Sequence, residues 1–151
     1  MSSFKISINI DELKGQLDAR LQTIKQNVSN AIADAVLKVE ELAKENLQTN
    51  HSVRTGALVS SIHSQFNGMS GTVGTNIEYA PYVEYGTSPH VITVKEKKVL
   101  ATKEGIGGGG GWVVFGKEVN HPGSAAKPFF GPAVDEAMVQ FKADLNKALD
   151  D

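Results

Sequence analysis

The sequence predicts an α+β fold in which an antiparallel-rich sheet is packed by a long N-terminal helix and a C-terminal helix. Three observations carry this prediction: a long apolar pattern of helical period near the N-terminus, several short strand-like segments separated by turn residues, and a second helical pattern at the C-terminus. Strands grouped between helices in this way are typical of α+β domains. With 151 residues, the chain is expected to form one domain, residues 1–151, that is large enough to bury a core.

The long helix is expected from about Asp11 to Gln48. Apolar residues recur there every three or four positions, which is the spacing of one helix face; they are Leu13, Leu17, Leu21, Ile24, Val28, Ile32, Ala35, Val39 and Leu42. Asn9 and Glu12 have the spacing of a capping box, and Asp11 is an alternative cap. Such a helix would be roughly 55 Å long, whereas a small domain is about 30 Å across. We therefore expect part of it to project or to pack on another subunit.

The strands are expected where apolar and polar residues alternate between turn formers. Along the chain these segments are residues 4–10, 58–66, 71–76, 90–95, 98–102 and 112–115. The second and third should form a hairpin, and the last two should pair across a run of five glycines. Because glycine has no side chain to bury and loses the most entropy on ordering, we expect a flexible loop at residues 105–111. The final helix is expected from Phe130 to Leu149, with Pro132 near its start.

All three tyrosines lie in the stretch from Tyr79 to Thr87. Pro81 fits the first residue of a short helical turn, and Gly86 fits its end. This predicts a short helical corner between strands. Tyrosine has a large apolar body and a polar tip, so three together indicate a packing junction or an interface. Glu84 is the one carboxylate among them, and we interpret it as a hydrogen-bonded structural group rather than a catalytic base.

Composition argues against several classes of function. The chain has no cysteine, which excludes disulfides and thiolate metal sites, and no apolar run approaches membrane-spanning length. The histidines, His51, His63, His90 and His121, have no ligand spacing, and the glycine run lacks the Lys-Ser/Thr of a phosphate-binding loop. We expect no catalytic residues, no cofactor, no metal and no membrane partner, and thus no enzyme.

Positive charge is concentrated late in the chain, although the net charge is −2. From Lys95 to Lys127 there are more lysines than glutamates, and the usual meaning is a solvated face. The alternative is a mild, sequence-independent attraction for phosphates. The candidate DNA-facing residues are Lys95, Lys97, Lys98, Lys103 and Lys117.

Four short motifs occur in a fixed order along the chain. They are Arg54-Thr55-Gly56-Ala57-Leu58 with Ser61-Ile62, Tyr79-Ala80 with Tyr82-Val83-Glu84 and Gly86-Thr87, His121-Pro122-Gly123, and Lys127-Pro128-Phe129-Phe130 with Pro132-Ala133. In this order they resemble the minor tail-component, or tail-completion (head–tail joining), family of lambda-like long-tailed bacteriophages. The run of five glycines is longer than that family's pattern.

This resemblance implies a non-enzymatic virion protein of the neck, assembled in the host bacterial cytoplasm. It would close the head-proximal end of the tail and join the tail to the head as a homo-oligomeric ring, for which a hexamer is one option. Its partners would be further copies of itself, other neck and tail proteins, and the DNA that passes through the lumen. The motif residues expected at interfaces are Arg54, Thr55, Gly56, Leu58, Tyr79, Tyr82, Glu84, Tyr85, Gly86, Thr87, Pro128, Phe129 and Phe130.

Three alternatives stay open at this stage. An intact phage, a defective prophage and a phage-tail-like bacteriocin particle would all contain such a protein. A small nucleic-acid-binding module would need a more basic surface than a net charge of −2 provides. A hydrolase would need converging titratable groups, which the sequence does not indicate.

Overall fold

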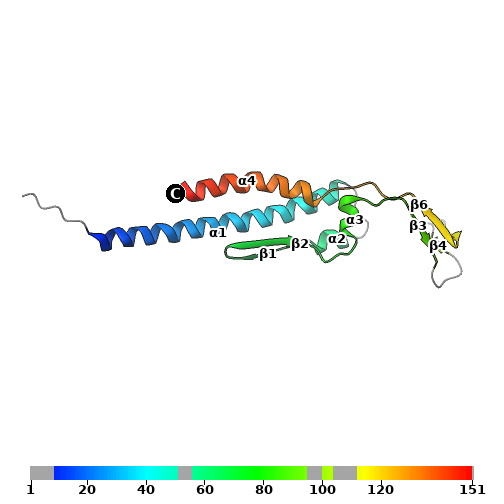
Figure 1. Ribbon diagram of the computed structural model, residues 1–151, viewed down its shortest axis with the longest axis horizontal. Helices are drawn as coiled ribbons and strands as arrows, with labels where there is room; N and C mark the ends of the chain where they lie inside the picture. The colour runs from blue at the N-terminus through cyan, green and yellow to red at the C-terminus, as the bar shows by residue number, and fades with distance from the viewer. Residues whose placement is uncertain (1–8, 51–55, 95–99, 104–111, 151) are drawn as a thin grey trace, which may run out of the picture. The chain divides into compact units, whose positions relative to one another are not determined.

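The computed structural model describes residues 9–50, 56–94, 100–103 and 112–150 (Figure 1). The order of elements is α1 (Ile10–Thr49), α2 (Ala57–Ser61), β1 (His63–Asn67), β2 (Ser70–Gly74), α3 (Ala80–Tyr85), β3 (His90–Thr93), β4 (Leu100–Lys103), β5 (Trp112–Gly116), β6 (Glu118–His121) and α4 (Phe130–Asp150). The predicted α+β class, with two long helices and antiparallel strand pairs, is confirmed. The chain groups into two compact units, Met1–Ile77 with Phe129–Asp151 and Glu78–Pro128. We call them the helical unit and the ribbon unit.

Helix α1 begins where the capping pattern predicts. Asn9 has an extended backbone, and its side chain accepts a hydrogen bond from the Glu12 amide at 3.2 Å. This satisfies one of the free N–H groups at the helix start. The strand expected over residues 4–10 is wrong at its last residue, because Ile10 is already helical; residues 4–8 lie outside the described residues.

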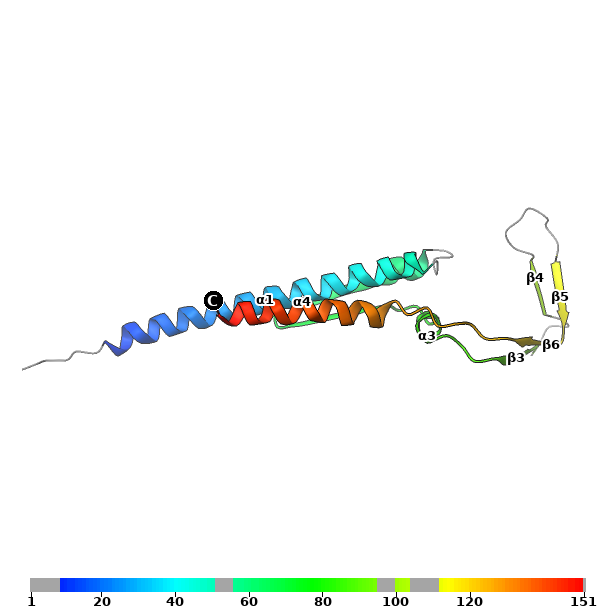
Figure 2. The same ribbon diagram turned by 90° about the horizontal axis from the view of Figure 1, so that it is seen from above.

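Helix α4 packs along the C-terminal half of α1 (Figures 1 and 2). Alanines are frequent among the buried residues of these two helices, and small side chains allow two helices to approach closely. The buried residues of α1 are Ala31, Val39, Leu42, Ala43 and Leu47, and those of α4 are Ala133, Ala137 and Ala148. The Asn46 side-chain amide donates to the Phe129 carbonyl oxygen at 3.0 Å, which ties the start of α4 to the end of α1. The predicted final helix is thus confirmed.

The β1–β2 hairpin also packs on α1, on the side away from α4 in Figure 1. Its register pairs His63 with Gly74 and Asn67 with Ser70, which leaves a two-residue loop. The loop is tied to the helix by the Ser29 hydroxyl, which donates to the Gly68 carbonyl oxygen at 3.0 Å. The hairpin prediction is confirmed.

The strand predicted to begin at Leu58 is wrong, because residues 57–61 form α2 and the strand starts at His63. The buried residues Leu58 and Ile62 are four positions apart, a spacing that suits both a strand and a helix. The hydroxyls of Ser60 and Ser61 donate to carbonyl oxygens three residues back, which fits a helical turn.

The ribbon unit contains α3 and two antiparallel strand pairs. Pro81 lies in the first turn of α3 and Gly86 follows its end with φ 72°, as predicted. β4 pairs with β5, which confirms the predicted pairing across the glycine run, and the loop predicted at residues 105–111 lies outside the described residues. β3 pairs with β6, a strand that the sequence did not indicate. The described strands of the whole chain therefore form three two-stranded sheets.

Candidate assembly surfaces

The tyrosine residues of the α3 region are largely exposed. Tyr79 is 45% exposed, Tyr82 61% and Tyr85 80%, whereas Ala80 between them is buried. Three large amphipathic rings at the surface of one short helix are more typical of an interface than of a packing corner. Their exposure makes this helix the first candidate surface.

A junction of two chain segments holds the end of this helix in place. Thr87 and Ser124 exchange backbone hydrogen bonds of 3.0 and 3.1 Å, and their hydroxyls lie 3.1 Å apart. The Lys127 amide donates to the Val83 carbonyl oxygen at 2.8 Å. We call this contact between residues 83–89 and 121–127 the strap.

Two glycines allow the strap to close. Gly86 and Gly123 both have positive φ, at 72° and 85°. A Cβ atom on Gly86 would collide with the backbone of Ser124, and one on Gly123 with the backbone of Thr87. Only glycine tolerates both the conformation and the contact. The Gly86-Thr87 and Pro122-Gly123 motifs, separate in the sequence, are thus two sides of one structural element.

The strap continues into a pair of stacked histidines. His90 and His121 are register partners in β3 and β6, and their ring centroids lie 5.0 Å apart. The Nδ1 of His90 lies 3.0 Å from the Ser88 carbonyl oxygen and therefore donates, while the Nδ1 of His121 accepts from the Gly123 amide at 3.0 Å. In the neutral pair, only the Nε2 of His90 keeps a free lone pair. Within the described residues, no group of three His, Cys, Asp or Glu could hold a metal ion.

The motif residues of the helical unit that the structure describes are mainly in the core. Leu58 and Phe129 are buried, and Gly56, with φ 71°, is the residue directly before α2. The Phe129 and Phe130 rings meet edge to face with centroids 6.3 Å apart. These residues hold α2 and the start of α4 on the core. Pro128, the last residue of the ribbon unit, is exposed. Arg54 and Thr55 lie outside the described residues.

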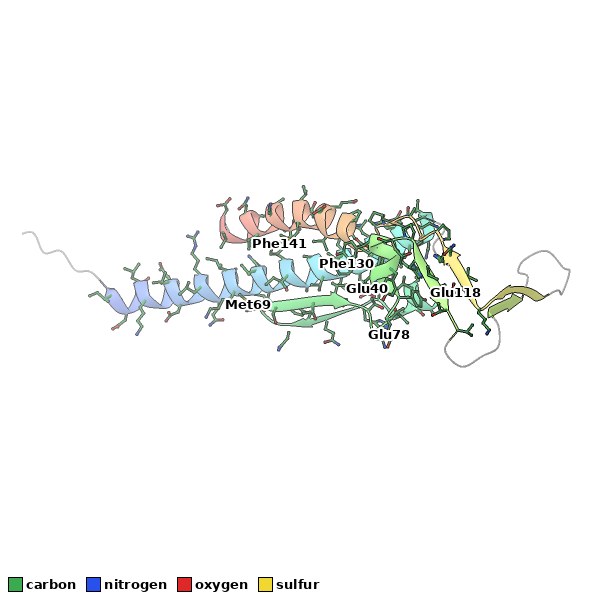
Figure 3. All side chains as sticks on the ribbon, turned by 45° about the vertical axis from the view of Figure 1, so that its right-hand side comes forward. Glu40, Met69, Glu78, Glu118, Phe130 and Phe141 are labelled. Carbon is green, nitrogen blue, oxygen red and sulfur yellow. The ribbon has the colours of Figure 1, made fainter. Side chains whose placement is uncertain are left out.

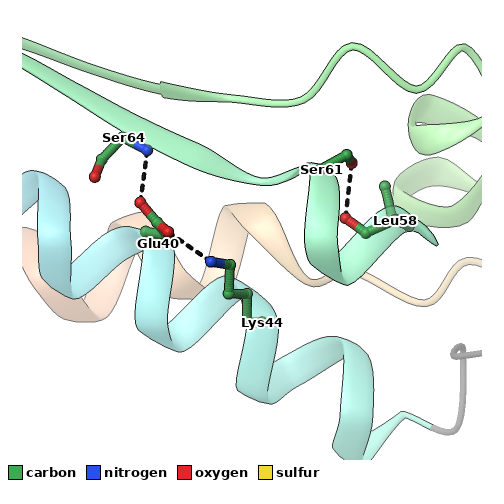
Figure 4. Close-up of polar contacts among 5 residues, drawn as sticks. All are labelled: Glu40, Lys44, Leu58, Ser61 and Ser64. Carbon is green, nitrogen blue, oxygen red and sulfur yellow. Dashed lines mark hydrogen bonds and ion pairs between the residues drawn. The ribbon is translucent and has the colours of Figure 1, made fainter. Parts of the chain in front are cut away.

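Glu40 is a polar anchor that the sequence did not single out. It lies on α1, and its carboxylate accepts from the Ser64 amide at 2.6 Å and from the Lys44 ammonium at 2.5 Å (Figure 4). The bonds from Lys44 and Ser64 lower the pKa of Glu40 to about 2. The interaction fixes the start of β1 against α1. The only sequence signal for this role is that Glu40 lies on the face of α1 that packs against the hairpin.

The lysines proposed to face DNA are described only in part. Lys117 is exposed, and its carbonyl oxygen accepts from the Val94 amide at 3.1 Å. Lys103 pairs with Trp112 in the register of β4 and β5. Lys95, Lys97 and Lys98 lie outside the described residues.

The second candidate surface is the N-terminal arm of α1, which we define as residues 10–25. In Figures 1 and 2, α1 runs on past the C-terminal end of α4 and past the loop end of the β1–β2 hairpin, where Figure 3 labels Met69. The apolar stripe of the arm is uncovered, with exposed fractions that rise from 45% at Leu21 to 72% at Ile10. The expectation that part of this helix projects is met in the helical unit.

None of the described helices is long and apolar enough to cross a membrane. Residues 12–86 match the model of a family described as "Bacteriophage HK97-gp10, putative tail-component". The matched range runs from the first turn of α1 to the residue after α3, so it includes the arm, the hairpin and the tyrosines. Comparison with curated proteins and with solved structures gives no match. The family match supports a phage tail-related, structural phage protein; the motifs after Gly86 lie outside it.

Proposed function

We propose that this chain is a non-enzymatic structural protein of a bacteriophage or prophage tail that acts at the neck. It completes the head-proximal end of the tail and joins the tail to the head, as a homo-oligomeric ring within the virion. The observation that carries the proposal is the similarity of residues 12–86 to the phage tail-component family.

The tyrosine helix supports a role in assembly. Tyr82 and Tyr85 offer large, exposed, amphipathic rings, and tyrosines of this kind are enriched among residues that dominate binding energy at interfaces. The strap holds the end of their helix, so these rings are presented with little loss of backbone freedom on binding. In a ring each copy meets the next head to tail, so the tyrosines of one copy would contact a different patch on its neighbour.

A complementation experiment tests this function. The gene is deleted from its phage or prophage, and wild-type protein or the double variant Tyr82→Ala/Tyr85→Ala is supplied in trans. We expect the double variant to fold normally, because both rings are exposed, but free heads and free tails should accumulate in electron micrographs. Phe66→Ala, which removes an exposed aromatic ring of the hairpin within the same matched range, is the control and should restore joined particles.

Each part of the proposal can fail separately. Joined, infectious particles from the deletion strain without complementation would refute the function itself. Normal joining by Tyr82→Ala/Tyr85→Ala would refute the tyrosine surface but leave the function standing. The reading frames beside the gene distinguish a phage or prophage from a tail-like bacteriocin particle, because head and portal proteins belong only to the former.

DNA in the lumen is the additional partner that the lysines would contact. Contacts to phosphates by exposed lysines are independent of sequence and weaken with salt. If Lys103 and Lys117 face the lumen, changing both to glutamine should leave head–tail joining intact and slow DNA delivery. Unchanged delivery would remove DNA from the list of partners.

A further inference from the structure

The uncovered stripe of the N-terminal arm has a symmetric spacing. Ile10 and Ile24 each lie seven positions from Leu17, and Leu13 and Leu21 each lie four positions from it. If two arms pack antiparallel with Leu17 at the centre, Leu17 faces its own copy, Leu13 faces Leu21, and Ile10 faces Ile24. Self-complementarity of this kind is what a two-fold contact requires.

The charges beside the stripe allow opposite charges to approach in the same antiparallel pairing. On a helical wheel, Asp11, Lys14, Asp18 and Lys25 all fall along one edge of the stripe. In an antiparallel pair of helices, the same edge of each copy meets. Lys14 then approaches Asp18 of the second copy and Asp11 approaches Lys25. In each of these pairs, the second residue lies two positions, or about 3 Å along the axis, from the position directly opposite the first. The two copies of Asp18 approach each other with the same offset, and the Lys14 side chains beside them offset this repulsion.

This complementarity also sets the orientation of the pair. In a parallel pair, opposite edges would meet, and the other edge of the stripe carries only Arg20 beside the uncharged Gln16 and Thr23. Parallel packing would therefore leave most of the four charges without a partner. None of those four side chains forms an ion pair with another described residue of its own chain.

The part of α1 that neither α4 nor the hairpin covers is about the same segment that is symmetric about Leu17. The loop of the hairpin reaches α1 at Ser29, and the shallow hollow beside Asn27 and Ala31 is shared with Asp144 and Ala148 of α4. The stripe is therefore exposed up to Leu21, and Ile24 at its inner end is half-buried. A similar spacing recurs around Val28, but there the helix is covered by α4 and the hairpin.

We propose that the arms of two copies of this chain, residues 10–25, pair antiparallel about Leu17 and form a two-fold dimer of the free protein. A two-fold contact closes after two copies, whereas a ring needs a contact that continues from copy to copy. The dimer is therefore a contact separate from the proposed ring, and it does not depend on the phage function.

The affinity should be modest, because only five apolar side chains per copy take part and a standard interface involves roughly 20–30 residues a side. Sedimentation of the full chain across protein concentrations from roughly 1 μM to 1 mM should show a reversible change from monomer to dimer. Leu17→Lys should abolish the change. Leu37→Lys alters an exposed leucine of α1 outside the arm and should preserve it.

Cysteine cross-linking tests the geometry, since the natural chain contains no cysteine. Leu17→Cys should form a disulfide-linked dimer under mild oxidation, because the two sulfur atoms meet on the axis. Leu13→Cys should not link to itself, because its copies would be about 12 Å apart along the axis, but it should link to Leu21→Cys when the two variants are mixed. Leu37→Cys, at an exposed position outside the arm, measures the rate of disulfide formation by random collision.

Charge exchange supplies a second, independent test. Lys14→Glu places like charges on both sides of the central Leu17 and should weaken dimerisation about tenfold. Adding Asp18→Lys restores opposite charges and should recover the affinity. The proposal is overturned if the protein stays monomeric to 1 mM, if Leu17→Cys links no faster than Leu37→Cys, or if Leu13→Cys links to itself as fast as Leu17→Cys.

Discussion

The two halves of α1 follow the same sequence rule and have opposite surroundings. From Ile10 to Val39 the stripe repeats every 11 residues, as Leu17, Val28 and Val39 show. A repeat of 11 residues keeps a stripe almost straight along the helix axis. In the C-terminal half this stripe is buried by α4 and the hairpin, and at Leu47 nothing is exposed, whereas in the arm it is open. The periodicity of a sequence thus specifies a helix face, but it does not specify what covers it.

The largest expected difference between the two halves of α1 is in how much a leucine-to-alanine change lowers the free energy of unfolding. Leu47→Ala should lower the free energy of unfolding by about 2–5 kcal/mol, because it removes a fully buried side chain from the contact of α1 with the core. Leu17→Ala in the arm should change it by about 0.5 kcal/mol or less. Urea denaturation at low micromolar protein, where the arms are unpaired, measures both variants. Equal losses would mean that the arm is covered within its own chain.

The packing of the hairpin on α1 should be nearly as sensitive to substitution as the site of Leu47. A Cβ atom on Gly71 would collide with the Val36 side chain, so Gly71→Ala should cost about 1–3 kcal/mol of unfolding free energy. Gly74→Ala in the same strand meets no atom within 4 Å and is the matched control. Adding Val36→Ala to Gly71→Ala should restore part of the loss, and failure to do so would contradict this packing.

Acid should lower the free energy of unfolding, because protonation of Glu40 weakens its contacts with Ser64 and Lys44. Its pKa is lowered from 4.5 to about 2 in the folded chain, so its contribution to stability is complete above about pH 5 and is lost as the pH falls towards 2. The side chain is 20% exposed, and we expect a loss of about 2 kcal/mol over this range.

Denaturation curves at pH 6 and pH 3 measure this effect. Glu40→Gln should make stability less dependent on pH, while Glu41→Gln, whose side chain pairs with Lys38 at the surface, should behave as wild type. An unchanged pH dependence in Glu40→Gln would show that the Ser64 and Lys44 contacts are not made in solution.

The smallest effect is expected at the free end of the arm. Asn9→Ala removes the cap of α1, worth about 1 kcal/mol to the local helix, but it should hardly change global unfolding because the first turns pack on nothing described. Amide hydrogen exchange near Ile10 should become faster, and Asn9→Asp should preserve the wild-type rate. Slow exchange in both variants would indicate that dimerisation already protects the arm.

The sequence indicated the motifs of the candidate surfaces but not their arrangement. Gly86 and Gly123 were visible as turn residues, yet their joint role in the strap depends on backbone segments that meet only in the folded chain. His90 and His121 carried no signal of proximity, because β6 is a short strand flanked by turn formers. Glu40 resembled any other helix glutamate, since its partner Ser64 lies in a different element.

By itself, the sequence determined the two long helices and α3 and, to within about a residue, where they begin and end. The cap at Asn9, the proline and glycine around α3, and the long apolar period of α1 act over a few residues, so local patterns suffice. Only the tertiary structure decided between helix and strand at Leu58, where the spacing fits both. It also decided which part of the α1 stripe is covered, because burial depends on elements distant in the chain. The same apolar stripe is core where α4 and the hairpin reach it and open surface at the arm, where they do not.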